Sequence, residues 1–205
     1  QPLAVEAGLE VLLQGGNAFD AAVTAAAVLN VVEPMSTGVG GDCFALLYMA
    51  DSGEIRALNG SGRAPEALDL DLFQSRGLHH VPSTGMLPVT VPGTVDGWAT
   101  LLDAHGTLSL AEALEPAIRY AEEGFHVTPI IAAHWARCAA KLRATPDAAK
   151  HYLVDGQRAP RAGELFRIPA LARTLRQIAE GGRDAFYRGS IAEAIVDFSA
   201  RNGGF

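Results

Sequence analysis

The sequence has few cysteines, a shortage of basic residues and no long hydrophobic run, and each shortage excludes a class of protein. Its two cysteines, Cys43 and Cys138, cannot form a disulfide framework, and their spacing fits no zinc site. Lysine and arginine number 16 against 23 acidic residues, which gives a net charge of -7 with no basic cluster. A nucleic acid or an anionic membrane needs clustered positive charge. We therefore expect neither as a partner.

No segment has the length of a membrane span. The most apolar helix expected, residues 18–32, covers about 24 Å at ~1.5 Å per residue, which falls short of the roughly 20 apolar residues that a span needs. No signal peptide is visible and both chain ends are interpreted as cut, so the compartment, periplasmic or cytoplasmic, stays open. No cofactor is indicated, and Walker, Gly-x-Ser-x-Gly and His-Glu-x-x-His motifs are missing.

The sequence does contain a largely apolar stretch, GGNAFDAAVTAAAVLNVVEP, that begins at Gly15. Asn17, followed three residues later by Asp20, predicts a capped helix start. Residues 18–32 carry apolar side chains in nearly every direction, which predicts a central helix surrounded by protein. Its alanines should let neighbouring elements approach closely, so a bulky substitution there should destabilise the fold.

The apolar run 43–50 predicts a strand covered on both faces, joined by turn residues to a second strand at 54–59. Most of the remaining signals are helical. Residues 3–14 are amphipathic and should lie on the outside of the central helix, with Glu6, Glu10 and Gln14 on one face and Leu9, Val11, Leu12 and Leu13 over the rest. We expect a short acidic helix within 66–73, a short strand at 87–91, a loop-rich stretch at 145–163, and helices at 94–105, 109–123, 129–141, 168–180 and 190–201. Residues 1–205 are treated as one domain or part of one.

Several residues invite a chemical interpretation without forming a complete site. His134 and Cys138 are four apart on an expected helix, but two side chains do not make a metal site, and packing explains them better. His79 and His80 lie in a polar stretch and are interpreted as solvated. The glycine turn after the apolar helix, flanked by Ser36, Thr37 and Asp42, either lines an anion site or only permits a tight helix-to-strand passage. A dinucleotide site is rejected, because its glycines follow a strand and open a helix.

Arg63 is the stronger candidate. It follows the second expected strand in Asn59-Gly-Ser-Gly-Arg-Ala-Pro65, where glycines and a proline can hold an arginine in place for bidentate pairing with a carboxylate. The alternative is a surface arginine in a turn. The residues alone leave these two readings equal.

The order of several blocks resembles the amino-terminal part of the gamma-glutamyltransferase family. The blocks are GGNAFDAAVTAAAVLNVVEP, STGVGGDCFALLY, RAP, TVPGTVDGW, HGTLSLAEALEPAIRYAEEGF, FYRGSIAEAIVDF and NGGF, and together they cover essentially the whole chain. The resemblance implies an α+β fold, the four-layer α-β-β-α sandwich of N-terminal-nucleophile hydrolases, of which this chain is a mostly helical portion with a β-hairpin. It also implies a precursor that cleaves itself into a large and a small subunit.

In that family the nucleophile is the threonine that begins the small subunit, and its own α-amino group serves as base. The resemblance therefore places no catalytic residue in this chain, which corresponds to the amino-terminal region of the large subunit. It implies that residues 1–205 alone are inactive. The expected partners are the small subunit and a γ-glutamyl or other amide substrate.

The resemblance assigns one substrate contact to this region, an arginine that binds the glutamate α-carboxylate in the pattern Arg, Glu, any residue, Ala, Pro. Ala64 and Pro65 match, but Ser61 holds the position of that arginine, and the arginine present is Arg63. Two residues make one strand period, so Arg63 can face the same side, displaced by about 6.6 Å at ~3.3 Å per residue. The substrate could therefore be a γ-glutamyl amide or another amide, such as oxamate or an acylase substrate. A non-catalytic scaffold is the alternative from another class.

Overall fold

The computed structural model describes residues 1–204, which form an α+β structure divided into two compact units. The helical unit comprises Gln1–Gly38 and Thr100–Gly182, and the hairpin unit comprises Val39–Ala99 and the residues from Arg183 onward. In chain order the elements are α1 (Pro2–Leu13), α2 (Ala18–Val32), β1 (Cys43–Met49), β2 (Glu54–Gly60), α3 (Leu70–Ser75), α4 (Thr94–His105), α5 (Leu110–Glu123), β3 (Phe125–His126), α6 (Pro129–Arg143), α7 (Pro146–Tyr152), β4 (Leu165–Phe166), α8 (Pro169–Tyr187) and α9 (Ser190–Arg201).

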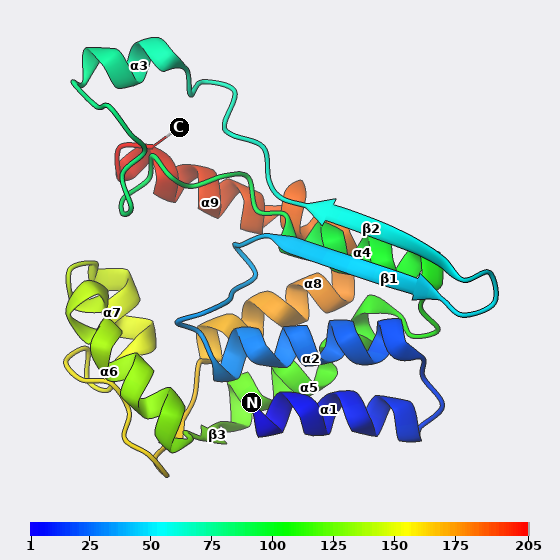
Figure 1. Cartoon of the computed structure of the whole chain (residues 1–205). Coiled ribbons are helices and arrows are strands. Elements are labelled where there is room, and N and C mark those ends of the chain that lie inside the picture. The colour runs from blue at the N-terminus through cyan, green and yellow to red at the C-terminus, as the bar shows by residue number, and fades with distance from the viewer. Residues whose placement is uncertain (205) are drawn as a thin grey trace. The chain divides into compact units, whose positions relative to one another are not determined.

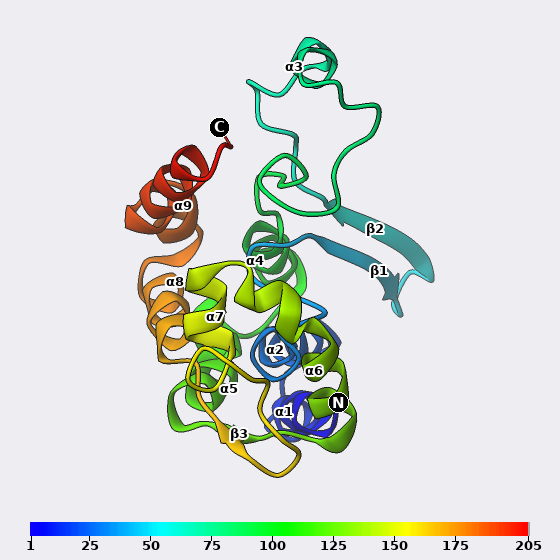
Figure 2. The same ribbon diagram turned by 90° about the vertical axis from the view of Figure 1, so that its left-hand side faces the viewer.

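The helical unit is built around α2, which packs against α1 on one side and α5 on another (Figures 1 and 2). The predicted capping box is confirmed, because Asn17 and Asp20 exchange side-chain and backbone hydrogen bonds at the start of the helix. A Cβ placed on Gly8 of α1 would lie 3.2 Å from the Ala21 carbonyl oxygen and 3.5 Å from Ala25 Cβ. The two helices therefore approach closely along the small residues, as the alanine pattern predicts.

Two details of the α1–α2 pair differ from the sequence prediction. The leucines expected to cover α1 lie on its outside, with Leu9 52% and Leu13 78% exposed, whereas the buried residues are the small Ala4, Ala7 and Gly8, with Val11. Close helix packing selects small side chains for the contact, and this displaces the larger ones outward. In α2, Ala18 and Ala22 are exposed within the described chain, so the helix is buried over most of its surface and not all of it.

The rest of the helical unit follows its cap and stop signals closely. Ser109 and Glu112 form the expected capping box of α5, and Gly124 ends that helix with a φ of 99°. The loop-rich prediction for 145–163 missed α7, and the two-residue strands β3 and β4, paired antiparallel, were also missed.

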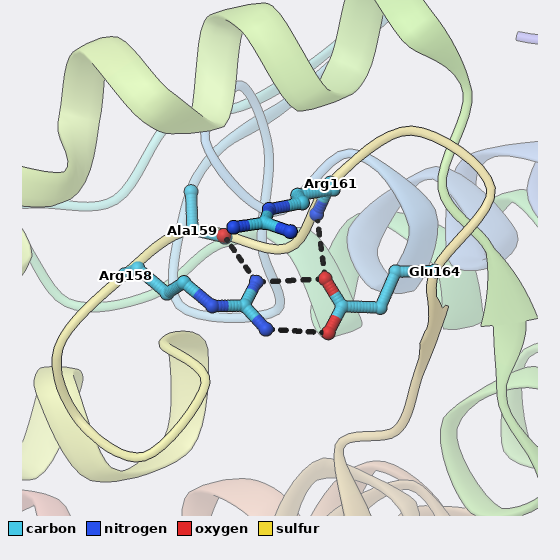
Figure 3. Close-up of polar contacts among 4 residues, drawn as sticks. All are labelled: Arg158, Ala159, Arg161 and Glu164. Atoms are coloured by element: carbon cyan, nitrogen blue, oxygen red, sulfur yellow. Dashed lines mark hydrogen bonds and ion pairs between the residues drawn. The ribbon is translucent and has the colours of Figure 1, made fainter.

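The segment before β4 is held by an ion pair (Figure 3). Both terminal guanidinium nitrogens of Arg158 donate to Glu164 at 2.8 Å, and the Arg161 amide donates to the same carboxylate at 2.8 Å. The hydrogen bond from Arg158 is the chief reason that the pKa of Glu164 falls from 4.5 to about 2. The carboxylate therefore stays charged, and the loop keeps its clamp, at any ordinary pH.

The hairpin unit contains the antiparallel pair β1–β2, joined through a turn at Gly53 (Figure 1). Phe44, Leu46 and Tyr48 on β1 are 67–82% exposed, and Ile55, opposite Tyr48, is 73% exposed. The prediction that both faces of this strand are covered is therefore wrong for the described residues. The other face is covered in part by α4, because a Cβ on Gly97 would lie 2.7 Å from Cys43 Cβ and 3.6 Å from Leu58 Cδ2.

Two further predictions need correction. The strand expected at 87–91 does not form, since Pro88 and Pro92 lack the amide that a strand ladder requires. The helix expected to end near Glu180 bends at Gly182, where φ is 64° and ψ is -159°, and then resumes through Tyr187. The short helix α3 forms with Asp69 as its cap, within and just after the acidic segment. No helix within residues 1–204 has both the length and the apolar character that a membrane crossing requires.

Candidate functional site

Ser61 and Arg63, the two residues that the sequence singles out, line one cleft of about 550 Å³ in the hairpin unit. The remaining walls come from residues 91–93, the first turn of α4 and the end of α8. The structure therefore brings together the position of the family arginine and the arginine that this chain carries. Both side chains are exposed to solvent.

Glycines set the path of the backbone along this cleft. A Cβ on Gly62 would overlap the Val91 carbonyl oxygen, and one on Gly93 would overlap the Gly60 carbonyl oxygen. The Val91 amide donates to the Arg63 carbonyl oxygen at 2.9 Å. The two segments therefore run against each other at backbone distance, and neither glycine position can hold a side chain. Gly62 stands where the family pattern has Glu, and the backbone path here leaves no room for a side chain at that position.

Asp42, which the sequence places beside the glycine turn, holds the same two segments. Its side chain accepts from the Gly62 amide at 2.9 Å, and its carbonyl oxygen accepts from the Thr94 hydroxyl at 3.1 Å. The neighbouring Gly41 carbonyl accepts from the Gly93 and Thr94 amides at 2.9 and 3.0 Å. Within this unit, the end of the glycine turn is therefore a structural anchor for the cleft.

The cleft has three guanidinium groups, and they differ in how they are neutralised. Arg183 Nε lies 2.7 Å from Asp96 Oδ1, and Arg188 Nε lies 3.7 Å from Asp184 Oδ1. Arg63 pairs with no carboxylate among the residues that the structure describes. An exposed arginine in this state can offer its planar fork to a carboxylate of a ligand. The residues that line the cleft include no histidine or cysteine, so its lining offers no His or Cys that could activate a nucleophile.

The other candidates from the sequence lie apart from the cleft lining. His134 is exposed and Cys138 half-buried on α6, and residues 1–204 contain no group of three or more side chains placed to hold a metal ion. His79 and His80 are exposed in the segment after α3. In the helical unit, Ser36 donates to Glu33 at 3.0 Å and Thr37 accepts from Asn30 at 3.0 Å, so both hydroxyls serve local structure.

Sequence reasoning missed Asp96, Arg183 and Tyr187 as cleft residues. Tyr187 belongs to the block FYRG, which carries part of the family resemblance, but no spacing or periodicity pointed to it. Arg183 and Tyr187 sit on the turn of helix after the Gly182 bend, a stretch that a glycine pair would ordinarily leave as a loop.

Comparison with known proteins gives a consistent match. The model of the gamma-glutamyltranspeptidase family matches residues 4–205. The chain is 42% identical over 204 residues to the glutathione hydrolase-like YwrD proenzyme of Bacillus subtilis, an alignment that covers 99% of this chain and 38% of that protein. It is 41% identical over 207 residues to the oxamate amidohydrolase proenzyme of Klebsiella pneumoniae, covering 98% of this chain and 38% of that protein.

The fold matches as well. The crystal structure of Helicobacter pylori gamma-glutamyltranspeptidase superposes with a TM-score of 0.94 at 35% identity, covering all of this chain and 59% of that chain. The chain thus spans 38% of the length of the two curated relatives named above.

Proposed function

Because the chain belongs to the gamma-glutamyltranspeptidase family, we propose that it is the large-subunit part of an enzyme that hydrolyses or transfers the acyl group of an amide. The nucleophile in this proposal is an N-terminal threonine outside the chain, activated by its own α-amino group. Both curated relatives named above are proenzymes, which supports a precursor that is cleaved into subunits.

The contribution of this chain is the recognition of a substrate carboxylate by Arg63. The observation that carries this role is that Arg63 alone, of the three arginines lining the cleft, has no carboxylate partner among the described residues. A guanidinium can pair with a carboxylate through two parallel hydrogen bonds, which fixes the orientation of the substrate as well as its affinity.

The small subunit of the same precursor is the proposed partner. The outer face of the β1–β2 hairpin carries the exposed side chains of Phe44, Leu46, Tyr48 and Ile55, an apolar strip too continuous for an ordinary soluble surface. The curated relatives named above extend well beyond the region matched by this chain. That additional polypeptide is the occupant we assign to the strip.

Two substrate classes fit the proposal. A γ-glutamyl amide agrees with the family and with the glutathione hydrolase-like relative. A shorter acid amide such as oxamate is favoured by Ser61, which leaves the family position without its arginine, and by the relative that is an oxamate amidohydrolase. Because Arg63 is displaced from the position of the family arginine, its guanidinium would pair with the carboxylate of an acyl group of different length.

The test uses the product of the complete gene. Intact-mass measurement should give two masses, since self-cleavage separates the subunits, and kcat/KM is then measured with glutathione and with oxamate. Arg63→Ala should lower kcat/KM for the preferred substrate by more than about tenfold, which corresponds to about 1.4 kcal/mol of transition-state stabilisation. Arg63→Lys should recover only part of the loss, because it keeps the charge without the fork.

Arg76→Ala, which removes another exposed arginine of the same unit, is the matched control and should leave kcat/KM unchanged. A change of less than about threefold in Arg63→Ala would remove Arg63 from the substrate site. A single uncleaved mass without turnover of either amide would instead favour a non-catalytic scaffold.

A further inference from the structure

The hydroxyl of Tyr187 makes two hydrogen bonds to backbone that is distant in sequence. It donates to the Pro92 carbonyl oxygen at 2.8 Å and accepts from the Asp96 amide at 3.0 Å. Burial raises the pKa of Tyr187, so the hydroxyl keeps its proton at ordinary pH and can make both bonds. One side chain at the end of α8 therefore holds both the segment before α4 and the first turn of α4.

This arrangement gives the first turn of α4 a hydrogen-bond acceptor from another element. The residue before α4 is Gly93, which has no side chain to accept from the free amides of the first turn. Serine or aspartate cannot substitute for it, because a Cβ at this position would overlap the Gly60 carbonyl oxygen. Close approach to β2 requires the glycine, and Tyr187 supplies from another element the acceptor that the Asp96 amide needs.

The segment that Tyr187 holds borders two cavities. Val91, Pro92 and Tyr187 line the polar cleft of about 550 Å³ and also line an apolar groove of about 420 Å³ that extends along α9. A backbone segment between two cavities has few packing contacts to fix its position. Its position therefore depends on hydrogen bonds: the one to Tyr187, the one to the Arg63 segment, and, just after it, those of Gly93 and Thr94 to the Gly41 carbonyl.

The same segment sets the position of Arg63. The Val91 amide donates to the Arg63 carbonyl, and the Val91 carbonyl oxygen fills the space beside Gly62. We infer that Tyr187 is a positioning residue of the substrate site, which fixes Arg63 for carboxylate binding through the backbone of residues 91–92. This inference rests on the proposed function, because it takes Arg63 to be the carboxylate contact.

The test is a comparison of Tyr187→Phe with wild type in the complete enzyme. The substrate is glutathione or oxamate, whichever the wild-type enzyme turns over faster. The variant removes one oxygen and keeps the ring, so KM should rise about fivefold, the effect expected for one neutral hydrogen bond, while kcat changes less than about twofold. Tyr152→Phe, which removes a hydroxyl that has no hydrogen-bond partner within residues 1–204, is the control and should leave both constants unchanged.

A double-mutant cycle separates positioning from a general structural role. If Tyr187 acts through Arg63, Tyr187→Phe should have no further effect on KM in an Arg63→Ala background. Equal effects of Tyr187→Phe in both backgrounds, or a KM for the single variant within twofold of wild type, would overturn the inference. The proposed carboxylate site survives in that case, provided that Arg63→Ala alone still raises KM.

Failure of the proposed carboxylate site itself can be distinguished from failure of the role of Tyr187. If Arg63→Ala leaves KM unchanged, the carboxylate site and the role of Tyr187 both fall, whatever Tyr187→Phe does. Thermal unfolding of each variant completes the set, because a fall in Tm for Tyr187→Phe without a KM change would assign the hydroxyl to stability alone.

Discussion

Asp20 and Thr107 are joined by two hydrogen bonds, in which the Thr107 amide and hydroxyl donate to the two Asp20 carboxylate oxygens at 2.8 and 2.7 Å. The Leu108 and Asn17 amides donate to the same carboxylate at 3.1 and 2.8 Å. Asp20 is fully buried, and no basic side chain pairs with it among the described residues. A buried charge is thus stabilised by neutral donors alone, and it ties the start of α2 to the segment between α4 and α5.

Replacing Asp20 by Asn should therefore be costly although the two side chains have the same shape. In Asp20→Asn an NH₂ group would replace one carboxylate oxygen. This NH₂ group would face the N–H and O–H groups that now donate to Asp20, so at least one of them would be buried without an acceptor. We expect a loss of about 2–4 kcal/mol in the free energy of unfolding, measured by urea denaturation. Asp103→Asn, at an exposed position of α4, should change it by less than about 0.5 kcal/mol. Equal midpoints for the two variants would contradict the role of Asp20.

The same group predicts a pH dependence. Burial acts to raise the pKa of Asp20, but the hydrogen bonds from Asn17, Thr107 and Leu108 outweigh it and hold the pKa below its ordinary value of 3.8. The unfolded chain then binds the proton first, so the stabilisation is present above the unfolded pKa and is lost as the pH falls through the lower folded-state pKa. Wild type should lose stability below about pH 4 more steeply than Asp20→Asn. Parallel profiles in urea unfolding would show that Asp20 is not the group responsible.

Gly62 should tolerate no side chain. In Gly62→Ala the new methyl group would overlap the Val91 carbonyl oxygen, so either the cleft backbone moves or the hairpin unit loses about 2 kcal/mol of stability. Both outcomes should lower kcat/KM of the complete enzyme. Gly40→Ala provides the comparison, because a Cβ at that position meets nothing within 4 Å. Wild-type activity and Tm in Gly62→Ala would mean that the two segments do not run as close as described.

The packing of α2 can be probed at two alanines five residues apart on the same helix. Ala27 is fully buried and Ala22 is exposed. Ala27→Leu should lower the free energy of unfolding by about 1–3 kcal/mol through overpacking, whereas Ala22→Leu should be nearly neutral, because alanine and leucine have similar helix propensity. Chemical denaturation of both variants measures the difference. A neutral Ala27→Leu would indicate unfilled space beside α2.

Local signals carried most of the prediction of helices. Asn17 with Asp20, and Ser109 with Glu112, act within one turn of helix, so the residues that form the cap are also the residues that the sequence shows side by side. The turn at Gly53 and the stop at Gly124 were likewise readable, because each needs a positive φ that glycine adopts freely.

Burial was harder to predict, because it depends on what lies opposite. Leu9 and Leu13 look like core residues in the sequence, yet α1 uses Ala7 and Gly8 to approach α2, and the leucines face outward. The continuous apolar run of β1 likewise gave no sign that one of its faces would be open in this chain, where burial alternates along the strand. Hydrophobicity reports a preference for burial, whereas the distance between neighbouring backbones decides which apolar residues are buried.

The candidate site divides in the same way. Arg63 was found from its local setting, a strand end between glycines and a proline, and from the family pattern. Tyr187 was not found, because its hydrogen-bond partners are backbone groups of Pro92 and Asp96, more than 90 residues away in the sequence. Every residue type provides a backbone carbonyl, so such a partner cannot be recognised from residue identity. The periodicity of apolar residues therefore cannot predict a hydrogen bond between a side chain and a distant part of the backbone.

The open face of the β1–β2 hairpin also affects how the chain behaves during its own synthesis. The hairpin is synthesised before any later part of the polypeptide that could cover it. Until then, the side chains of Phe44, Leu46, Tyr48 and Ile55 remain exposed to water. An exposed apolar hairpin of this kind binds holdase chaperones, and where chaperones are absent it associates with other copies of the same chain. When residues 1–205 are expressed alone, the yield of soluble protein should therefore depend strongly on the expression rate and the temperature. The stability of the helices should matter less, although they make up most of the chain.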